Sequence, residues 1–242
     1  MVSKNQIKFI TSLQQKKHRI ESGFFIAEGN KIIFEFIDSG YSVESIFSVS
    51  EIGFSKRDVP LTIVSQSDLK KMSALVTPNE SVGVFQIPIS AVLKDKGFIV
   101  ALDSIRDPGN LGTIIRLCDW FGVTQLVCSK DTVDVYNPKV IQATMGSLAR
   151  VNIFYQDLEV WMSKTKLPVL GAFMDGCNVY ASQLPQEAIL VMGNEANGIS
   201  SDLEQLIKTK ISIPRFGEVQ KTESLNVATA TAILLSEFRR NS

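Results

Sequence analysis

The chain has 242 residues with 25 basic and 25 acidic side chains, so its formal net charge is zero. A neutral total does not indicate a nucleic-acid partner, and any such role has to rest on local patches of charge. The chain is 45% hydrophobic, which is ample for a core, yet no apolar run approaches the ~20 residues of a membrane span. Its first residues are polar and basic, so we expect a soluble, cytoplasmic protein with one large or two unequal domains.

Cysteine and histidine usage excludes several kinds of site. Cys118, Cys128 and Cys177 lie far apart without paired spacing, and the single histidine is His18. We therefore expect buried free thiols, with no zinc site and no disulfide framework. A serine or cysteine triad cannot be assembled with so remote a histidine. The chemistry is expected to use neither a metal ion nor a histidine base.

Residues 4–19 are basic and contain no acidic side chain. Ile7, Ile10 and Leu13 recur at helical spacing, which predicts an amphipathic helix with a basic tail. Two interpretations of its cations stay open, because they can form an ordinary solvated face or contact nucleic acid. The cations are Lys4, Lys8, Lys16, Lys17 and Arg19.

The elements that follow predict a small α/β unit over residues 1–90 that contains no cluster of catalytic groups. We expect strands near 24–27, 43–49, 61–64 and 82–87, with helices near 30–39 and 67–72. The charged segment 88–97 fits neither pattern, and we interpret it as the link to a second domain.

From residue 98 onward strands and helices alternate. Strands are predicted at 98–102, 125–128, 151–154, 169–173, 188–192 and 211–213, and helices near 111–121, 138–145, 158–164 and 201–207, with a final helix that contains residues 227–238. Such alternation is typical of a largely parallel sheet covered on both faces. The final helix is apolar nearly all round, so we expect it to be buried against the sheet or a partner.

Three of these strands end in loops rich in Gly, Asn, Ser and Glu, after residues 102, 192 and 213. Open α/β sheets bind their ligands at the carboxyl ends of parallel strands, so the three loops predict one site. No G-x-G-x-x-G fingerprint and no phosphate-loop motif is present, which counts against the nucleotide-binding folds that those motifs mark.

Several polar residues in these loops have a structural and a functional interpretation. Asn110 follows a tight turn and can cap the next helix, and Ser224 can cap the last one. Arg116 lies among apolar neighbours and needs either Asp119 or an anionic ligand as its partner. Glu195 can be a loop carboxylate near a helix start or a site residue. Spacing alone leaves these alternatives open.

Three segments resemble the signature motifs of the SpoU (TrmH) family of RNA ribose 2′-O-methyltransferases, and they occur in the family's order. They are residues 108–116, 192–199, and 213–217 with 224–228. The resemblance implies a SPOUT-type parallel α/β sheet with a C-terminal deep trefoil knot over residues 91–242. Residues 1–90 resemble, more loosely, a ribosomal-protein-like α/β domain that binds the RNA substrate.

The resemblance also implies S-adenosylmethionine as cofactor, ribosomal or transfer RNA as substrate, and a homodimer with each active site near the subunit interface. It implies neither a membrane nor a metal. The residues that it implies for the cofactor are Met192, Gly193, Ile213, Pro214 and Leu225. The catalytic residues that it implies are Asn110, Arg116, Glu195, Ser224 and Asn226.

The implied reaction is an in-line displacement in which a ribose 2′-hydroxyl takes a methyl group from sulfur, so alignment is the main requirement. A guanidinium stays protonated in proteins, so Arg116 is expected to clamp a phosphate and orient the hydroxyl rather than act as a base. The connection Glu218–Glu223 is longer than in many relatives, and its Lys221 either reaches RNA phosphate or is solvated.

Two other classes stay open at this point. One is a non-catalytic RNA-binding relative with the same fold, which would not bind S-adenosylmethionine. The other is an unrelated doubly wound nucleotide-binding enzyme such as a hydrolase, against which the missing phosphate-loop and dinucleotide motifs count.

Overall fold

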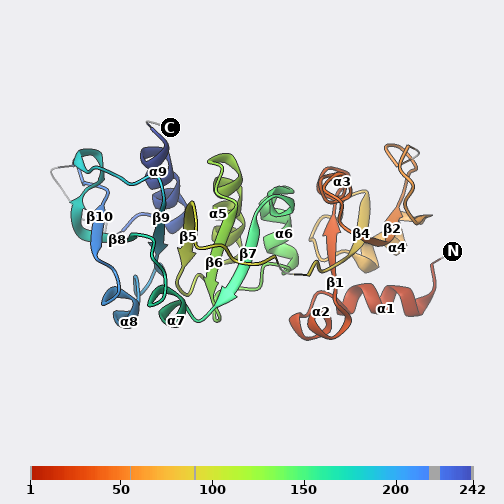
Figure 1. Cartoon of the computed structure of the whole chain (residues 1–242). Coiled ribbons are helices and arrows are strands. Elements are labelled where there is room, and N and C mark those ends of the chain that lie inside the picture. Colours follow the sequence, from red (N-terminus) through yellow and green to blue (C-terminus); the bar gives the residue numbers. More distant parts are fainter. Residues whose placement is uncertain (1, 55, 90, 218–223, 241–242) are drawn as a thin grey trace. The chain divides into compact units, whose positions relative to one another are not determined.

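The structure is a computed structural model that describes residues 2–54, 56–89, 91–217 and 224–240 (Figure 1). The chain forms two compact units, and each is described by itself. The first contains residues 1–89 and 134–149, and the second contains residues 90–133 and 150–242. Residues 134–149 were expected to belong to the domain of residues 91–242, whereas the structure groups them with the first unit.

The first unit is built on a four-stranded sheet with the order β1-β4-β2-β3. Its strands are β1 (Phe24–Glu28), β2 (Val43–Ser48), β3 (Leu61–Ile63) and β4 (Ser81–Gln86). Its helices are α1 (Lys4–Ser12), α2 (Lys16–Ser22), α3 (Asn30–Asp38), α4 (Gln66–Met72) and α6 (Pro138–Thr144), followed by a short 3-10 helix, η1 (Ser147–Ala149). Strand β4 pairs antiparallel with β1 and β2, and β2 pairs parallel with β3.

Alternation along the strands divides the core of this unit into two layers. Ile26, Phe47 and Val84 pack with buried residues of α1 and α4 on one face of the sheet. On the other face Phe25 packs against Phe36 of α3, with their ring centroids 5.3 Å apart. Helices α1 and α4 therefore share one outer surface of the unit.

The basic segment at the amino terminus is two helices rather than the single one predicted. Helix α1 ends at Ser12, and α2 begins at Lys16 after a short turn. Arg19, predicted as part of the basic surface, is only 2% exposed, so it does not belong to that surface. Its Nη1 donates to the Leu13 carbonyl at 2.8 Å and its Nε donates to Asp134 Oδ2 at 3.1 Å. This ion pair attaches residues 134–149 to the first unit.

Glu28 is a buried carboxyl group at the end of β1, only 3% exposed. Burial raises its pKa above the usual 4.5, although hydrogen bonds from the Ser73 hydroxyl and the Ala74 N–H oppose that rise. The folded state therefore holds the proton to higher pH than the unfolded chain does. Glu28 lowers the stability of the folded state progressively as the pH rises from its unfolded pKa to its folded pKa.

We expect Glu28→Gln to remove this pH dependence while the amide still accepts the hydrogen bond from Ala74. The stability of the variant relative to wild type should increase as the pH rises through that window, by at most about 1.4 kcal/mol per pH unit. Melting curves of both proteins at a series of pH values from 4.5 upward measure the difference. Parallel curves for the two proteins would contradict the assignment.

The second unit contains a six-stranded, fully parallel sheet with the order β10-β8-β9-β5-β6-β7 (Figure 1). Its strands are β5 (Phe98–Leu102), β6 (Gln125–Ser129), β7 (Asn152–Gln156), β8 (Val169–Asn178), β9 (Ala188–Met192) and β10 (Thr209–Ser212). Its helices are α5 (Pro108–Trp120), α7 (Leu158–Met162), α8 (Ser201–Glu204) and α9 (Val227–Arg239), with a 3-10 helix, η2 (Val179–Ala181), after β8. This α/β sheet agrees with the predicted fold class.

Helices cover both faces of this sheet, as the alternation predicted. Helices α7 and α8 pack on the face that carries Ile99 and Ile189. Helices α5 and α9 lie together on the other face, where Phe98 meets Phe238 with ring centroids 4.7 Å apart. The order in which strands are added to the sheet reverses between β5 and β9, because β6 and β7 lie on one side of β5 and β8 and β10 lie on the far side of β9. Parallel sheets bind their ligands at such a reversal.

The three cysteines are free, and two of them are buried as predicted. Burial raises the pKa of the Cys118 and Cys128 thiols, so both stay protonated. Cys177 is exposed, against the prediction. It lies in the second half of β8, beyond the residues that pair with β9, where among the described strands only β10 pairs with β8. Within the described ranges, no helix is both long and apolar enough to cross a membrane.

Candidate functional site

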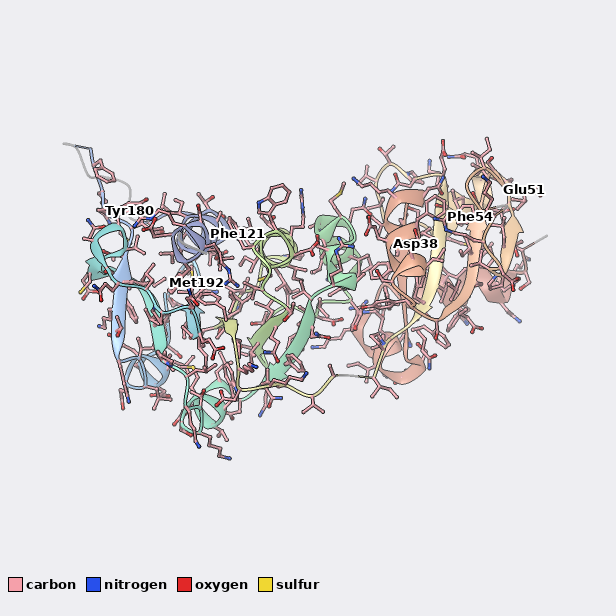
Figure 2. All side chains as sticks on the ribbon, turned by 45° about the horizontal axis from the view of Figure 1, so that its top comes forward. Asp38, Glu51, Phe54, Phe121, Tyr180 and Met192 are labelled. Carbon is pink, nitrogen blue, oxygen red and sulfur yellow. The ribbon has the colours of Figure 1, made fainter. Side chains whose placement is uncertain are left out.

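A cavity of about 500 Å³ opens in the second unit where β8, β9, β10 and α9 meet. Its walls are largely apolar, with Met192 at the end of β9 (labelled in Figure 2) and Ala230 and Leu234 on α9. Asn194, Glu195 and further polar groups lie along its lining. A largely apolar cavity of this size with a few polar groups is typical of a small-molecule site.

The loop after β9 depends on a glycine that cannot carry a side chain. A Cβ atom at Gly193 would lie 2.3 Å from the backbone carbon of Gly198 and 2.5 Å from its carbonyl oxygen. The loop folds back on itself here, since Asn194 and Gly198 exchange two backbone hydrogen bonds of 2.9 and 2.8 Å. The loop therefore presents bare backbone to the cavity.

Two polar residues fasten this loop to the one after β5. Asp103 Oδ2 accepts the Ser200 N–H at 2.8 Å, and the Asp103 N–H donates to the Met192 carbonyl at 2.9 Å. Asn194 Nδ2 donates to the Ser104 carbonyl at 2.6 Å. Neither Asp103 nor Asn194 was among the predicted site residues, although Asp103 directly follows β5 and Asn194 lies two residues after the end of β9. That position at adjacent strand ends was the signal that could have found them.

Ser104 holds the left-handed backbone conformation, with φ of 59°, at the start of the β5 loop. Its N–H donates to Ser129 Oγ at 2.8 Å, and its hydroxyl donates to Asp131 at 2.7 Å. Hydrogen bonds from Ser104 and Ser129 lower the pKa of Asp131, so this carboxylate is ionised at neutral pH. These bonds fix the carbonyl that receives Asn194.

A chain of hydrogen bonds joins the three predicted motifs at the cavity. Asn110 Nδ2 on α5 donates to Glu195 Oε1 in the β9 loop. Asn226 Nδ2 donates to Asn110 Oδ1 at 2.9 Å, at the start of α9. The side-chain amides of Asn110 and Asn226 both donate in this chain, and the Asn110 oxygen accepts the bond from Asn226. Three segments remote in sequence thus meet, with the carboxylate of Glu195 at one end of the chain.

The helix caps differ from the two expected. Asp107, not Asn110, caps α5, because Pro108 occupies the first helical position and the Asp107 side chain accepts the Asn110 N–H at 2.8 Å. Asn226, not Ser224, caps α9, and its Oδ1 accepts from Ala228 and Thr229. The Asn110 side chain is therefore available for Glu195 and Asn226.

Arg116 stands apart from this hydrogen-bonded chain. Its side chain is exposed on α5, and it makes no hydrogen bond or ion pair with another residue in the described ranges. The pairing with Asp119 considered from spacing is wrong, because Asp119 receives Arg150 with nitrogen–oxygen distances of 2.8 to 3.0 Å. Arg116 shares the exposed side of α5 with Trp120, whose surface is 84% exposed.

The predicted site residues thus fall into three groups. Those that line the cavity are Met192, Gly193, Glu195, Ile213, Pro214, Ser224 and Leu225. Asn110 and Asn226 are connected to the cavity by the hydrogen bonds that end at Glu195. Arg116 neither lines the cavity nor belongs to this chain of hydrogen bonds. The long connection Glu218–Glu223, with Lys221, lies outside the described residues. Over the described ranges, no three His, Cys, Asp or Glu side chains are grouped so that they could hold a metal ion.

Comparison with known proteins now identifies the family. The sequence profile described as "SpoU rRNA Methylase family" matches residues 97–236, and that described as "MRM3-like substrate binding domain" matches residues 4–83. The chain belongs to the SpoU rRNA methylase family. This match confirms the family that the three motifs predicted, and with it the SPOUT-type α/β fold.

Solved structures of SpoU-type proteins resemble the whole chain. A TrmH-family protein from Porphyromonas gingivalis is 38% identical, with a TM-score of 0.91 and complete coverage of both chains. An rRNA methyltransferase from Sinorhizobium meliloti with bound AdoMet is 29% identical, with a TM-score of 0.86 over 99% of this chain and 97% of that one. The 23S rRNA guanosine 2′-O-methyltransferase RlmP of Bacillus subtilis is 27% identical over 98% of this chain and 97% of its own length.

These relatives confirm the predicted enzyme class, an RNA 2′-O-methyltransferase that uses S-adenosylmethionine. The cavity suits that cofactor, because its apolar walls can take the adenine and its bare backbone at Gly193 admits close approach.

Proposed function

We propose that this chain methylates a ribose 2′-hydroxyl of ribosomal RNA rather than transfer RNA, and that the cavity of the second unit is the cofactor site. One observation carries the proposal: all five residues implied for the cofactor line a single cavity, and Glu195 connects its lining to Asn110 and Asn226. The rRNA substrate is supported by RlmP, which resembles the chain along nearly its entire length. An rRNA substrate also fits the cytoplasmic location expected from the sequence.

The cavity divides into parts suited to different parts of S-adenosylmethionine. The backbone at Gly193, Ile213 and Leu225 offers amide and carbonyl groups to the adenosine and methionine moieties, while Met192 and Pro214 supply apolar contact. When bound, the cofactor supplies an electrophilic methyl group on sulfur. The protein's task is to align a hydroxyl with that methyl group and to guide one proton away.

Asn110, Asn226 and Glu195 act as positioning groups in this proposal. Their mutual hydrogen bonds fix the start of α5, the start of α9 and the β9 loop with respect to each other. Ser224 lines the cavity beside them and offers a hydroxyl to the ribose. A guanidinium can form two parallel hydrogen bonds to a phosphate, so the role of Arg116 is to clamp the phosphate next to the target ribose.

The proposal includes a homodimer, which accounts for the position of Arg116. The exposed side of α5 carries Thr113, Arg116 and Trp120, and an 84% exposed tryptophan is a typical anchor of a protein interface. A partner subunit on this side would cover Trp120 and let Arg116 of one subunit serve the cavity of the other. The deep trefoil knot remains a prediction of family membership.

The first unit is the proposed RNA-binding part, corresponding to residues 1–90 together with the segment 134–149. Its match to a substrate-binding domain supports this division of labour. The second unit, within residues 91–242, carries the chemistry.

Mapping of 2′-O-methyl groups tests the proposed function. Total RNA from cells with and without the gene is compared, and purified protein is then incubated with S-adenosylmethionine and an in vitro transcript of the same cells' 23S rRNA. We expect one ribose of 23S rRNA to lose its methyl group in the deletion strain and to regain it in vitro. Loss of a tRNA methyl group instead would contradict the substrate, and an unchanged map without cofactor binding would favour a non-catalytic RNA-binding protein.

A further inference from the structure

The first unit concentrates its positive charge on one surface. Helices α1, α2 and α4 carry six exposed lysines, here called the lysine ridge: Lys4, Lys8, Lys16, Lys17, Lys70 and Lys71. Only Glu21 and Asp68 oppose them on these helices, and each is paired, with Lys17 at 3.8 Å and with Lys71 at 2.8 Å. The ridge therefore keeps a clear excess of positive charge.

Hydrogen bonds show that the elements that carry these lysines adjoin one another. Lys4, Lys8 and Thr11 follow the i, i+4, i+7 spacing that places side chains along one side of a helix. Thr11 Oγ1 donates to the carbonyl of Lys71 at 3.3 Å, so this side of α1 borders the end of α4.

The turn that leads into α2 reaches the same place. Gln14 Nε2, two residues before Lys16, donates to the carbonyl of Ser73 at 3.3 Å. The end of α4, with its two lysines, is thus flanked by α1 and by the turn before α2. Helices α1 and α4 and the turn before α2 therefore adjoin one another.

The rest of this unit carries the opposite charge. Among the exposed and half-buried side chains of residues 2–89 beyond the ridge helices, six are acidic: Glu35, Asp38, Glu44, Glu51, Asp58 and Glu80. Three are basic, Lys31, Lys56 and Arg57, and Arg57 is paired with Asp38 at 3.0 Å. Figure 2 labels two of them, Asp38 at the end of α3 and Glu51 in the connection after β2. The net charge of the whole chain is zero and therefore does not indicate this uneven distribution of charge.

We propose that the lysine ridge is the surface on which the first unit holds the phosphate backbone of the substrate RNA. The inference rests on the proposed function and adds to it the place of contact. Lysine ammonium groups contact phosphate as point charges without reading sequence, so they fix the register of an RNA while other residues select the nucleotide. The acidic side chains outside the ridge disfavour RNA, so they leave the ridge as the favoured docking surface of residues 2–89.

The test compares two charge-reversed proteins with the same change in net charge. The ridge variant is Lys4→Glu, Lys8→Glu, Lys70→Glu, Lys71→Glu. The control variant is Lys94→Glu, Lys164→Glu, Lys166→Glu, Lys208→Glu. These four exposed lysines of the second unit precede β5, β8 and β10, so they lie at the end of the sheet where the strands begin, opposite the cavity. Affinity for an in vitro 23S rRNA transcript is measured by filter binding at several salt concentrations, and affinity for S-adenosylmethionine by calorimetry.

We expect the ridge variant to bind RNA at least about tenfold more weakly than wild type. The salt slope should fall by roughly 3 to 4, because four phosphate contacts are lost and each removes about 0.7 to 0.9 from that slope. Cofactor affinity should be unchanged in both variants, and the control should bind RNA within about twofold of wild type, because its lysines lie outside the proposed contact. Milder Lys→Gln changes at the four ridge positions repeat the measurement if charge reversal impairs folding.

The outcomes separate the two proposals. If wild type binds and methylates RNA but the ridge variants bind it as the control does, the ridge proposal is overturned and the proposed function stands. If wild type neither binds nor methylates rRNA, the proposed function fails first. Selective loss of binding to phosphatidylglycerol vesicles, with RNA affinity retained, would overturn the ridge proposal in favour of a membrane surface.

Discussion

Arg116→Ala is expected to reduce methyl transfer by roughly a thousandfold, equivalent to about 4 kcal/mol of transition-state stabilisation, while cofactor affinity stays at the wild-type value. Arg116 neither lines the cavity nor bonds to any residue of the described ranges, so its removal should leave the cofactor site and the fold intact. Single-turnover transfer to rRNA and calorimetry with S-adenosylmethionine measure the two effects separately.

Lys164→Ala is the matched control, because it removes an exposed cation of the same unit at the opposite edge of the sheet. It should transfer methyl groups at the wild-type rate. Arg116→Lys should recover only part of the activity, since an ammonium group cannot form two parallel hydrogen bonds to a phosphate. Unchanged turnover in Arg116→Ala would remove this residue from the mechanism.

Gly193→Ala is expected to abolish measurable cofactor binding, because the added methyl group would lie 2.3 Å from backbone atoms of the same loop. The clash is with backbone rather than with a flexible side chain, so the loop has to open and the cavity lining changes with it. Calorimetry with S-adenosylmethionine measures the loss, and near-ultraviolet circular dichroism checks the fold.

Gly217→Ala provides the control within the same cavity. A Cβ atom at Gly217 meets no described atom within 4 Å, so this variant should keep its cofactor affinity. Wild-type affinity in Gly193→Ala would show that the β9 loop does not contact the cofactor.

The two variants together test the dimer. When Arg116→Ala and Gly193→Ala subunits are co-expressed with different tags, a heterodimer holds one intact cavity and one Arg116 on the opposite subunit. If Arg116 serves the partner's cavity, the mixture should regain roughly a quarter of wild-type activity, because half of randomly formed two-fold dimers are mixed and each has one complete site. An inactive mixture would place Arg116 in the site of its own subunit.

The strand pattern and the loop chemistry allowed much of the fold and site to be predicted. Buried parallel strands read as short apolar runs, and Gly, Asn and Pro mark their ends, so β5 and β9 were located to the residue. The cavity residues were found through resemblance to the family's motifs rather than from spacing.

Other features could not be predicted because they depend on tertiary contacts. The grouping of residues 134–149 with the first unit rests on contacts between residues far apart in the sequence, such as the ion pair of the buried Arg19 with the partly buried Asp134. The role of Asn110 required knowing that Asp107 caps α5, since both residue types can cap a helix. The polarity of the first unit also emerged only when α4 was placed beside α1.

A crystal structure of the protein with S-adenosylhomocysteine, the product of the cofactor, tests the central claim most directly. We expect the ligand to occupy the cavity of the second unit, with its polar atoms against the backbone of Gly193, Ile213 and Leu225. An empty cavity at saturating ligand, or ligand bound elsewhere on the chain, would contradict the account.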